Sequence, residues 1–268
     1  MSVIDKFFKF KSNTGDFCTA VIVAAGNSQR MGRDKIMMPL GDRPVIAHTL
    51  AAFQKCEHID EIIVVTRPER LQEIADICQE YDIDKIRKII VGGKTRAQSA
   101  LLGVLEASEN AALIAIHDGA RPFVSEAVID RTVNSAKQNH AVAPAVYATD
   151  TVRIVNAKGV TVSTPDRNTV ALIQTPQVFD ADLIKNALMK AVKSNLRITD
   201  DCSAVEAMGV KVTVVAGEQT NIKLTSVTDV YIAEKILADR GTDKGESVTV
   251  TMSTDSSRAE SSSSAVLR

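Results

Sequence analysis

The sequence has no excess of charge of either sign. Its 32 Lys and Arg residues are balanced by 33 Asp and Glu residues, which gives a formal net charge of -1. Proteins that bind nucleic acid through its phosphates usually carry a clear basic excess. We therefore expect no nucleic-acid partner, and any anionic substrate requires cations that the fold gathers at one place.

Cysteine is scarce, and the four that occur, Cys18, Cys56, Cys78 and Cys202, are widely spaced. No pair has the CxxC spacing of zinc sites and redox motifs. This pattern is typical of reduced thiols in a cytosolic protein. The sequence also lacks an apolar run long enough to span a bilayer, and residues 1–16 lack the apolar block and cleavage site of a signal peptide. We expect a cytoplasmic protein with no membrane partner.

The sequence does contain a regular alternation of apolar strands and amphipathic helices. Four apolar runs indicate strands at 18–23, 59–66, 86–93 and 112–118. This alternation predicts an α/β fold with a Rossmann-like, doubly wound and mostly parallel sheet, covered by helices on both faces. Ligands bind such sheets outside the carboxyl ends of the strands. The segments that begin at Ala24, Gly92 and His117 are therefore candidate site segments.

The alternation breaks in the second half of the chain. Two extended stretches flank a turn at Asn156–Gly159, which predicts a β-hairpin arm at about 148–170 that projects from the sheet. Exposed strand edges pair with other chains, so the arm is a candidate contact with a partner. Toward the C-terminus Ser and Thr accumulate, which predicts a disordered tail at 241–268. The division expected is an extension at 1–16, one α/β domain at 17–240 and this tail.

The first candidate site is the loop AAGNSQRMGRDK, which follows the first strand. Ala24, Ala25 and Gly26 are small enough for backbone N–H groups to approach phosphate oxygens. The loop has neither the Gly-Lys-Ser/Thr of a P-loop nor the GxGxxG of a dinucleotide site. Two of its cations, Arg30 and Lys35, bracket Gly32 and suit a loop that stabilises a departing pyrophosphate. The alternative is an exposed turn with solvated basic residues.

Two further strand ends carry candidate residues. Asp118, in the segment HDGARP, either positions Mg²⁺ or a substrate hydroxyl or forms a turn or helix cap. His117 beside it is interpreted as a packed histidine rather than a base, and Arg121 either meets a phosphate or pairs with a carboxylate. Gly92 and Gly93, in the segment GGKTRAQS, either allow close approach of a base or ribose or simply end the strand, as glycine pairs often do, and Ser99 lies about one helical turn beyond them.

Two isolated cations, Arg167 in TPDR and Lys223 in NIKLT, lie in otherwise neutral stretches. Each either clamps a phosphate or is a solvated surface charge. The sequence shows no candidate Ser/His/Asp triad and no Cys beside a His. A phosphate monoester as the nucleophile explains the absence of both. It is already ionised at neutral pH and needs orientation rather than a general base.

The order and spacing of these segments resemble the 2-C-methyl-D-erythritol 4-phosphate cytidylyltransferase family of the non-mevalonate isoprenoid pathway. The resemblance runs from about Cys18 to Leu237 and rests on VAAGNSQRMG, KIMMPLGDRPVIAHTL, GGKTRAQS, HDGARP, TPDR, QTPQVF, TDD and NIKLT. It implies a homodimer that transfers the cytidylyl group of CTP to a sugar-alcohol phosphate and releases pyrophosphate. It also implies Mg²⁺, bound chiefly through the CTP phosphates.

The resemblance implies roles for residues that match by motif position. Arg30 and Lys35 would stabilise the transition state, while Arg167 and Lys223 would hold the acceptor phosphate for attack. The other acceptor-binding residues would be Asp118, Arg121, Thr151 and Thr175. The CTP-binding residues would be Ala24, Ala25, Gly26, Gly93, Ser99 and Ala120.

Three alternatives to this function differ in substrate or class. A ribitol-5-phosphate cytidylyltransferase is a similar enzyme with another acceptor. A non-catalytic sugar-nucleotide-binding protein would not need all four of the cations Arg30, Lys35, Arg167 and Lys223. A Rossmann oxidoreductase is disfavoured because the sequence lacks GxGxxG and the acidic residue expected downstream of it.

Overall fold

The computed structural model of the protein describes residues 16–26 and 34–242. The strands of its central sheet are β1 (Cys18–Val23), β4 (Glu61–Thr66), β5 (Ile86–Val91), β6 (Leu113–Asp118), β7 (Ala141–Tyr147), β10 (Ala171–Ile173), β11 (Gln177–Asp180) and β12 (Thr213–Ala216). Two short ladders pair β2 (Pro39–Leu40) with β3 (Arg43–Pro44) and β8 (Ile154–Val155) with β9 (Thr161–Ser163). The helices are α2 (Val45–Lys55), α3 (Leu71–Glu80), α4 (Arg96–Leu105), α5 (Glu126–Asn139), α6 (Ala181–Lys193), α7 (Asp201–Glu206) and α8 (Val227–Thr242), with 3-10 turns η1 (Pro68–Arg70) and η2 (Arg167–Thr169).

The sheet confirms the predicted mostly parallel, doubly wound arrangement. Its order is β10-β7-β11-β6-β1-β4-β5, with β12 paired to β7. Strand β1 lies in the middle, parallel to both β4 and β6, and Val23 is in register with Val65 on one side and Asp118 on the other. The chain winds outward from β1 to β5 and then crosses to β6, so the strand order reverses beside β1. Ligands bind such sheets at this crevice.

The sequence pattern did not indicate strands β10 and β11. Strand β11 is antiparallel to β6 and to β7 and separates these two parallel strands. It is four residues long and follows the cis peptide bond between Thr175 and Pro176. A run this short has too few residues for an alternating pattern, so only its tertiary partners define it.

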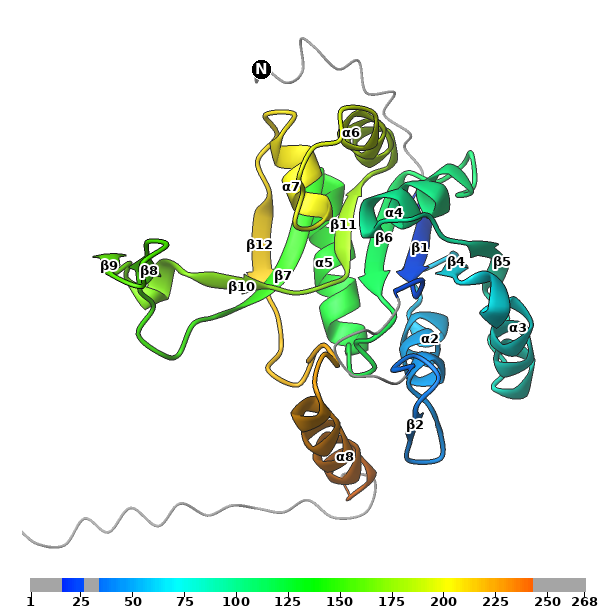
Figure 1. The fold of residues 1–268 in the computed structure, drawn as a ribbon. Helices are drawn as coiled ribbons and strands as arrows, with labels where there is room; N and C mark the ends of the chain where they lie inside the picture. Colours follow the sequence, from blue (N-terminus) through cyan, green and yellow to red (C-terminus); the bar gives the residue numbers. More distant parts are fainter. Residues whose placement is uncertain (1–15, 27–33, 243–268) are drawn as a thin grey trace, which may run out of the picture.

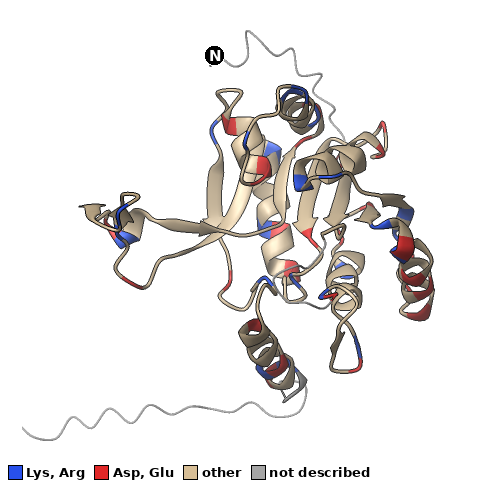
Figure 2. Cartoon of the chain, in the orientation of Figure 1, with Lys and Arg blue, Asp and Glu red and all other residues tan. Residues whose placement is uncertain are grey.

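Side chains of β1 alternate between two hydrophobic layers, as strand geometry requires. Cys18, Ala20 and Ile22 pack in the layer of α2, α3 and α5, whereas Val21 packs in the layer of α4, α6 and α7. The two groups of helices thus cover opposite faces of the sheet (Figure 1). Lys, Arg, Asp and Glu are spread over the helices, the loops and the arm (Figure 2). The sheet interior is therefore an apolar support for the polar edge where the strands end.

The arm, residues 148–170, projects away from the sheet beside β7 and β10 (Figure 1). Its tip is the predicted turn, in which the Gly159 backbone N–H donates to the Asn156 carbonyl at 3.0 Å. Several apolar side chains of the arm are exposed, and Val162 keeps 65% of its accessible surface. The expected extension at 1–16 and the Ser-rich tail at 241–268 lie almost wholly outside the described residues. No helix among those that the structure describes is long and apolar enough to cross a membrane.

The close packing of α4 on the sheet depends on Gly103. A Cβ atom at this position would overlap the Val21 side chain and lie 2.8 Å from Cγ2 of Val65. Both valines are β-branched and held in the sheet, so they cannot rotate away freely. Gly103→Ala gains about 1 kcal/mol of helix propensity, but overpacking costs roughly 1–3 kcal/mol.

We expect Gly103→Ala to lower the free energy of unfolding by about 1 kcal/mol, measured by urea denaturation. Leu102→Gln, at the exposed neighbouring position of the same helix, should change it by less than about 0.5 kcal/mol. A Gly103→Ala variant as stable as the unmodified protein would contradict the proposed fit between α4 and β1.

Candidate active site

A cavity of about 300 Å³ opens at the carboxyl ends of β1, β5 and β6. Its lining comes from four segments that are far apart in the sequence. The lining residues are Val23, Ala24, Ala25, Gly26, Lys35, Ile36, Gly93, Lys94, Thr95, Arg96, Ser99, Asp118, Ala120 and Lys223. All six residues expected to bind the nucleotide are among them, together with Lys35, Asp118 and Lys223.

The loop that follows β1 is held against its neighbours by backbone hydrogen bonds. The Ala24 N–H donates to the Val65 carbonyl at 2.7 Å, and the Gly119 N–H donates to the Val23 carbonyl at 2.9 Å. A Cβ atom at Gly92 would lie 2.5 Å from the Ala25 Cβ atom. Small residues are therefore required here, and the backbone at this strand end stays open to a ligand.

Helix α4 begins at the wall of the cavity. The Thr95 side chain caps the helix by accepting from the Gln98 N–H, and the Ser99 hydroxyl accepts from the Gly93 N–H at 3.1 Å. These bonds fix the turn between β5 and α4. The positive end of the helix dipole faces the cavity, which favours a negatively charged ligand there.

Asp118 is the centre of the charged groups in the site. Its Oδ2 lies 2.7 Å from Nζ of Lys223 and 3.9 Å from Nε of Arg121, and its Oδ1 lies 3.2 Å from Nε of Arg96. Burial opposes ionisation of this carboxyl, but the nearby Arg96 and Lys223 hold its pKa well below the usual range. Asp118 is therefore a carboxylate, and it anchors three cations from separate segments.

His117 is buried beside Asp118 and does not face the cavity. Its Nδ1 lies 3.0 Å from the Thr175 hydroxyl and its Nε2 lies 3.3 Å from the Arg121 carbonyl. Burial lowers the pKa of His117 to about 3. The imidazole is thus neutral and has a partner at each nitrogen, which confirms the interpretation of His117 as a packed histidine.

Two residues expected to bind the acceptor, Thr175 and Arg121, support the site from behind the cavity wall. The Thr175 hydroxyl accepts from the Asp118 N–H at 3.2 Å. The Arg121 Nη1 donates to the Asn221 carbonyl at 2.7 Å. Neither residue is among those that line the cavity, so in this structure they position Asp118 and the Lys223 segment.

The remaining acceptor-binding candidates lie apart from the cavity of the same chain. Thr151 and Arg167 are exposed on the arm, where Arg167 donates to the Thr149 carbonyl at 2.9 Å. A single chain therefore does not bring Arg167 and Lys223 together. Arg30 falls within residues 27–33, outside the described part of the chain.

The structure adds two charged residues that sequence reasoning did not select. Arg96 lines the cavity and bridges Asp118 to Asp201, whose Oδ2 lies 2.8 Å from Nη2 of Arg96. Arg96 lies in the segment GGKTRAQS and Asp201 in TDD, both of which carry the family resemblance. Neither segment indicates by itself that the two residues meet.

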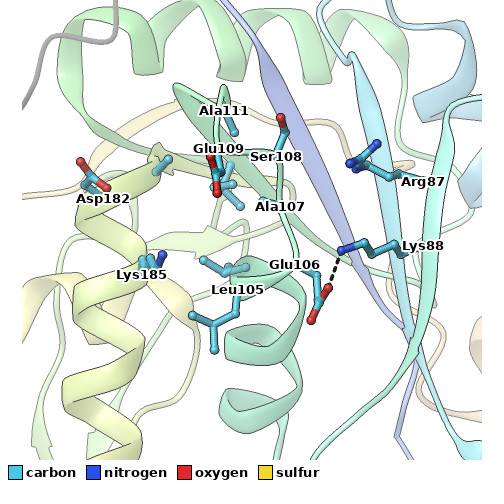
Figure 3. A pocket seen from close by; sticks show the side chains of 13 residues that line it. Arg87, Lys88, Leu105, Glu106, Ala107, Ser108, Glu109, Ala111, Asp182 and Lys185 are labelled. Atoms are coloured by element: carbon cyan, nitrogen blue, oxygen red, sulfur yellow. Dashed lines mark hydrogen bonds and ion pairs between the residues drawn. The ribbon is translucent and has the colours of Figure 1, made fainter.

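A larger cavity, of about 690 Å³, lies near the amino end of β6 between α4 and α6 (Figure 3). Charges of both signs surround it, and the Lys88 ammonium is 2.6 Å from the Glu106 carboxylate. Apolar side chains such as Leu105 also line it. It contains none of the residues expected at the site and shows no preference for an anion, so the smaller cavity is the candidate active site.

Comparisons with known proteins identify the family to which the chain is similar. A family model described as 2-C-methyl-D-erythritol 4-phosphate cytidylyltransferase matches residues 18–239. The protein of that name from Halalkalibacterium halodurans is 39% identical over 224 residues, which cover 83% of this chain and 97% of the relative. The one from Alkaliphilus metalliredigens is 40% identical over 225 residues, covering 83% of this chain and 93% of the relative.

A solved structure, the 4-diphosphocytidyl-2C-methyl-D-erythritol synthase of Anaerococcus prevotii, superposes with a TM-score of 0.76 at 36% identity, covering 83% of this chain and 96% of that one. The 2-C-methyl-D-erythritol 4-phosphate cytidylyltransferase of Thermus thermophilus gives a TM-score of 0.67 at 28% identity, covering 82% and 98%. The fold and the family matches define the chain as a nucleotidyltransferase. The chain belongs to the 2-C-methyl-D-erythritol 4-phosphate cytidylyltransferase family.

The buried, neutral His117 makes the stability of the protein sensitive to acid. Its pKa is about 3 in the folded state, against about 6.5 in the unfolded chain. Between these values the unfolded chain binds more protons, so the free energy of unfolding falls as the pH falls below about 6.5. The expected loss from this residue is about 2 kcal/mol between pH 7.5 and pH 5.

Urea denaturation at a series of pH values measures this loss. The His117→Gln variant should lose about 2 kcal/mol less than the unmodified protein over the same interval, because glutamine does not titrate. His58→Gln, a substitution away from the site, serves as the control. Identical pH profiles for His117→Gln and the unmodified protein would disprove the assignment.

Proposed function

We propose that the chain transfers the cytidylyl group of CTP to 2-C-methyl-D-erythritol 4-phosphate. The products are 4-diphosphocytidyl-2-C-methyl-D-erythritol and pyrophosphate, in the non-mevalonate route to isoprenoid precursors. Membership of the family supports this activity. The observation that carries the residue assignment is the cavity that brings the small-residue loop, the start of α4, Asp118 and Lys223 together.

In this proposal CTP occupies the cavity. The backbone of Ala24, Ala25 and Gly26 approaches the triphosphate, and Gly93, Ser99 and Ala120 contact the nucleoside. Positive charge must be available where the pyrophosphate departs, because negative charge builds up there in the transition state. Lys35 lines the cavity and supplies such a charge, and Arg30, which lies outside the described residues, is proposed for the same role.

The acceptor half of the site is assigned to Lys223 and Asp118. The Lys223 ammonium, 2.7 Å from Asp118, is held at the cavity and attracts the acceptor phosphate, while the carboxylate contacts the methylerythritol hydroxyls. The attacking phosphate oxygen is already ionised at neutral pH. Catalysis therefore needs alignment of the two substrates rather than a general base, which agrees with the buried, neutral His117.

Thr151 and Arg167 are proposed to act in the active site of a second copy of the chain. They lie on the arm, away from the cavity of their own chain. The arm and the neighbouring β10 expose Val162 and Leu172, at 65% and 53%, and an exposed apolar surface of this kind is typical of an interface. We propose a homodimer in which each arm supplies Arg167 to the partner.

Mg²⁺ is proposed as the cofactor, bound chiefly through the CTP phosphates. The one carboxylate that lines the described part of the cavity is Asp118, and its oxygens already lie close to Arg96, Lys223 and Arg121. Mg²⁺ usually keeps several waters and is held in such sites by substrate phosphates and few protein ligands. Bound Mg²⁺ would neutralise charge on the triphosphate.

The free, buried thiols of all four cysteines support a cytoplasmic location.

Pyrophosphate release tests the acceptor. With CTP and Mg²⁺, purified protein should release pyrophosphate when 2-C-methyl-D-erythritol 4-phosphate is added, and at most slowly with ribitol 5-phosphate. Fast release with ribitol 5-phosphate alone would assign the chain to the rival cytidylyltransferase. Tight CTP binding without release with either acceptor would favour a non-catalytic sugar-nucleotide-binding protein.

Mixing two inactive variants tests the exchange of arms. Lys35→Ala impairs the cavity of its own chain, and Arg167→Ala impairs the arm given to the partner. In a mixed dimer one site carries both defects and the other carries neither. Random equimolar mixing should therefore restore roughly a quarter of the unmodified activity, because half of the dimers have one intact site of two.

The control mixes Lys35→Ala with Lys223→Ala. Both substitutions affect the cavity of their own chain, so no mixed dimer contains an intact site and activity should not return. If Arg167→Ala also failed to complement Lys35→Ala under conditions where subunits exchange, the arm would not serve the partner's site.

A further inference from the structure

Asp201, the first residue of α7, is a carboxylate with no accessible surface. Among the described side chains, Arg96 links it to the candidate active site, and Nη2 of Arg96 is 2.8 Å from Asp201 Oδ2. The Nε of the same guanidinium is 3.2 Å from Asp118 Oδ1. Arg96 is therefore fixed between a buried carboxylate behind the cavity and the carboxylate that faces it.

The position of Asp201 is fixed by Gln177 of β11. The Gln177 Oε1 accepts from the backbone N–H groups of Asp201 and Cys202, at 3.1 and 3.0 Å. Its Nε2 donates to Oδ2 of Asp200 at 2.8 Å. The start of α7 is thus tied to the central sheet, and the Asp201 carboxylate has a defined direction toward α4.

Stability alone explains this buried charge poorly. Burial raises the pKa of Asp201 despite the nearby Arg96, and Oδ1 of Asp201 has no hydrogen-bond partner among the described residues. A buried ion pair often contributes little net stability, because removing both charges from water is costly. Groups that are costly to bury are frequent at functional sites.

The geometry of Arg96 shows what Asp201 can control. A guanidinium has five N–H groups in a rigid plane, and two of them are used by Asp118 and Asp201. Arg96 lines the cavity. With Asp201 in place, the plane of the guanidinium is fixed by two anchors, whereas with Asp118 alone it could pivot about a single bond.

We propose that Asp201 is a positioning residue for the acceptor half of the active site, acting through Arg96 on Asp118. This inference rests on the proposed function. Arg96 offsets part of the negative charge of Asp118, whose other oxygen pairs with Lys223 at 2.7 Å. If Arg96 pivots away, Asp118 attracts Lys223 more strongly and competes with the acceptor phosphate for its ammonium.

The test compares Asp201→Asn with Glu206→Gln in the full-length chain. Asp201→Asn should raise the KM for 2-C-methyl-D-erythritol 4-phosphate on the order of tenfold, the size expected for weakening a hydrogen bond between charged groups. The KM for CTP should change less than about threefold, because Asp201 contacts neither the loop after β1 nor the hydrogen bond between Gly93 and Ser99. Glu206, the last residue of α7, is exposed to solvent. Glu206→Gln removes a carboxylate from the same helix without changing the partners of Arg96 or Gln177, so it should retain both KM values.

A double variant separates positioning from a general effect on folding. If Asp201 acts through Arg96, then Arg96→Gln with Asp201→Asn should have the same acceptor KM as Arg96→Gln alone. Independent effects that multiply would overturn the proposal, and so would an unchanged acceptor KM in a folded Asp201→Asn variant. If Asp201→Asn does not fold, Arg96→Lys replaces it, since lysine cannot reproduce the planar fork, and a normal acceptor KM in that variant also overturns the proposal. Lack of pyrophosphate release by the unmodified protein would instead refute the proposed function.

Discussion

The ionised Asp118 carboxylate is the interaction on which the candidate site depends. It is largely buried, and a buried charge is costly unless cations and hydrogen bonds compensate it. Arg96, Arg121 and Lys223 supply that compensation from three separate segments. One carboxylate at the end of β6 therefore determines how the start of α4, the loop after β6 and the Lys223 segment come together at the cavity.

The parallel register of the sheet makes this position of Asp118 possible. Val23 and Asp118 are in register at the ends of neighbouring parallel strands, so the loop that begins at Ala24 lies beside the carboxylate. These features could be predicted from the sequence, because apolar runs, small residues and strand ends are local signals. The predicted loop, the Gly93–Ser99 turn and Asp118 indeed line one cavity.

Other parts of the site have no local signal in the sequence. Arg96 and Asp201 are separated by 105 positions, and their contact depends on Gln177 in β11. That strand is too short for a periodic pattern, and its antiparallel course between β6 and β7 is set by tertiary pairing. The arm shows the opposite case, since the Asn156–Gly159 turn has a local signal. The position of the tip of the arm relative to another chain has no such local signal.

The same charges that assemble the site also limit its chemistry. Each cation bound to Asp118 is partly neutralised, so it attracts an incoming phosphate less strongly than a free cation would. Lys223 is 33% exposed and remains accessible from the cavity, whereas Arg121 is 11% exposed and bonded to the Asn221 carbonyl. Of these two residues, the more exposed Lys223 is better placed to bind substrate, and the more buried Arg121 is better placed to support the structure.

His117 is neutral and enclosed, so the described residues give the site cations and backbone N–H groups but no histidine base. Such a site suits a reaction whose nucleophile arrives already ionised and whose leaving group carries the charge away.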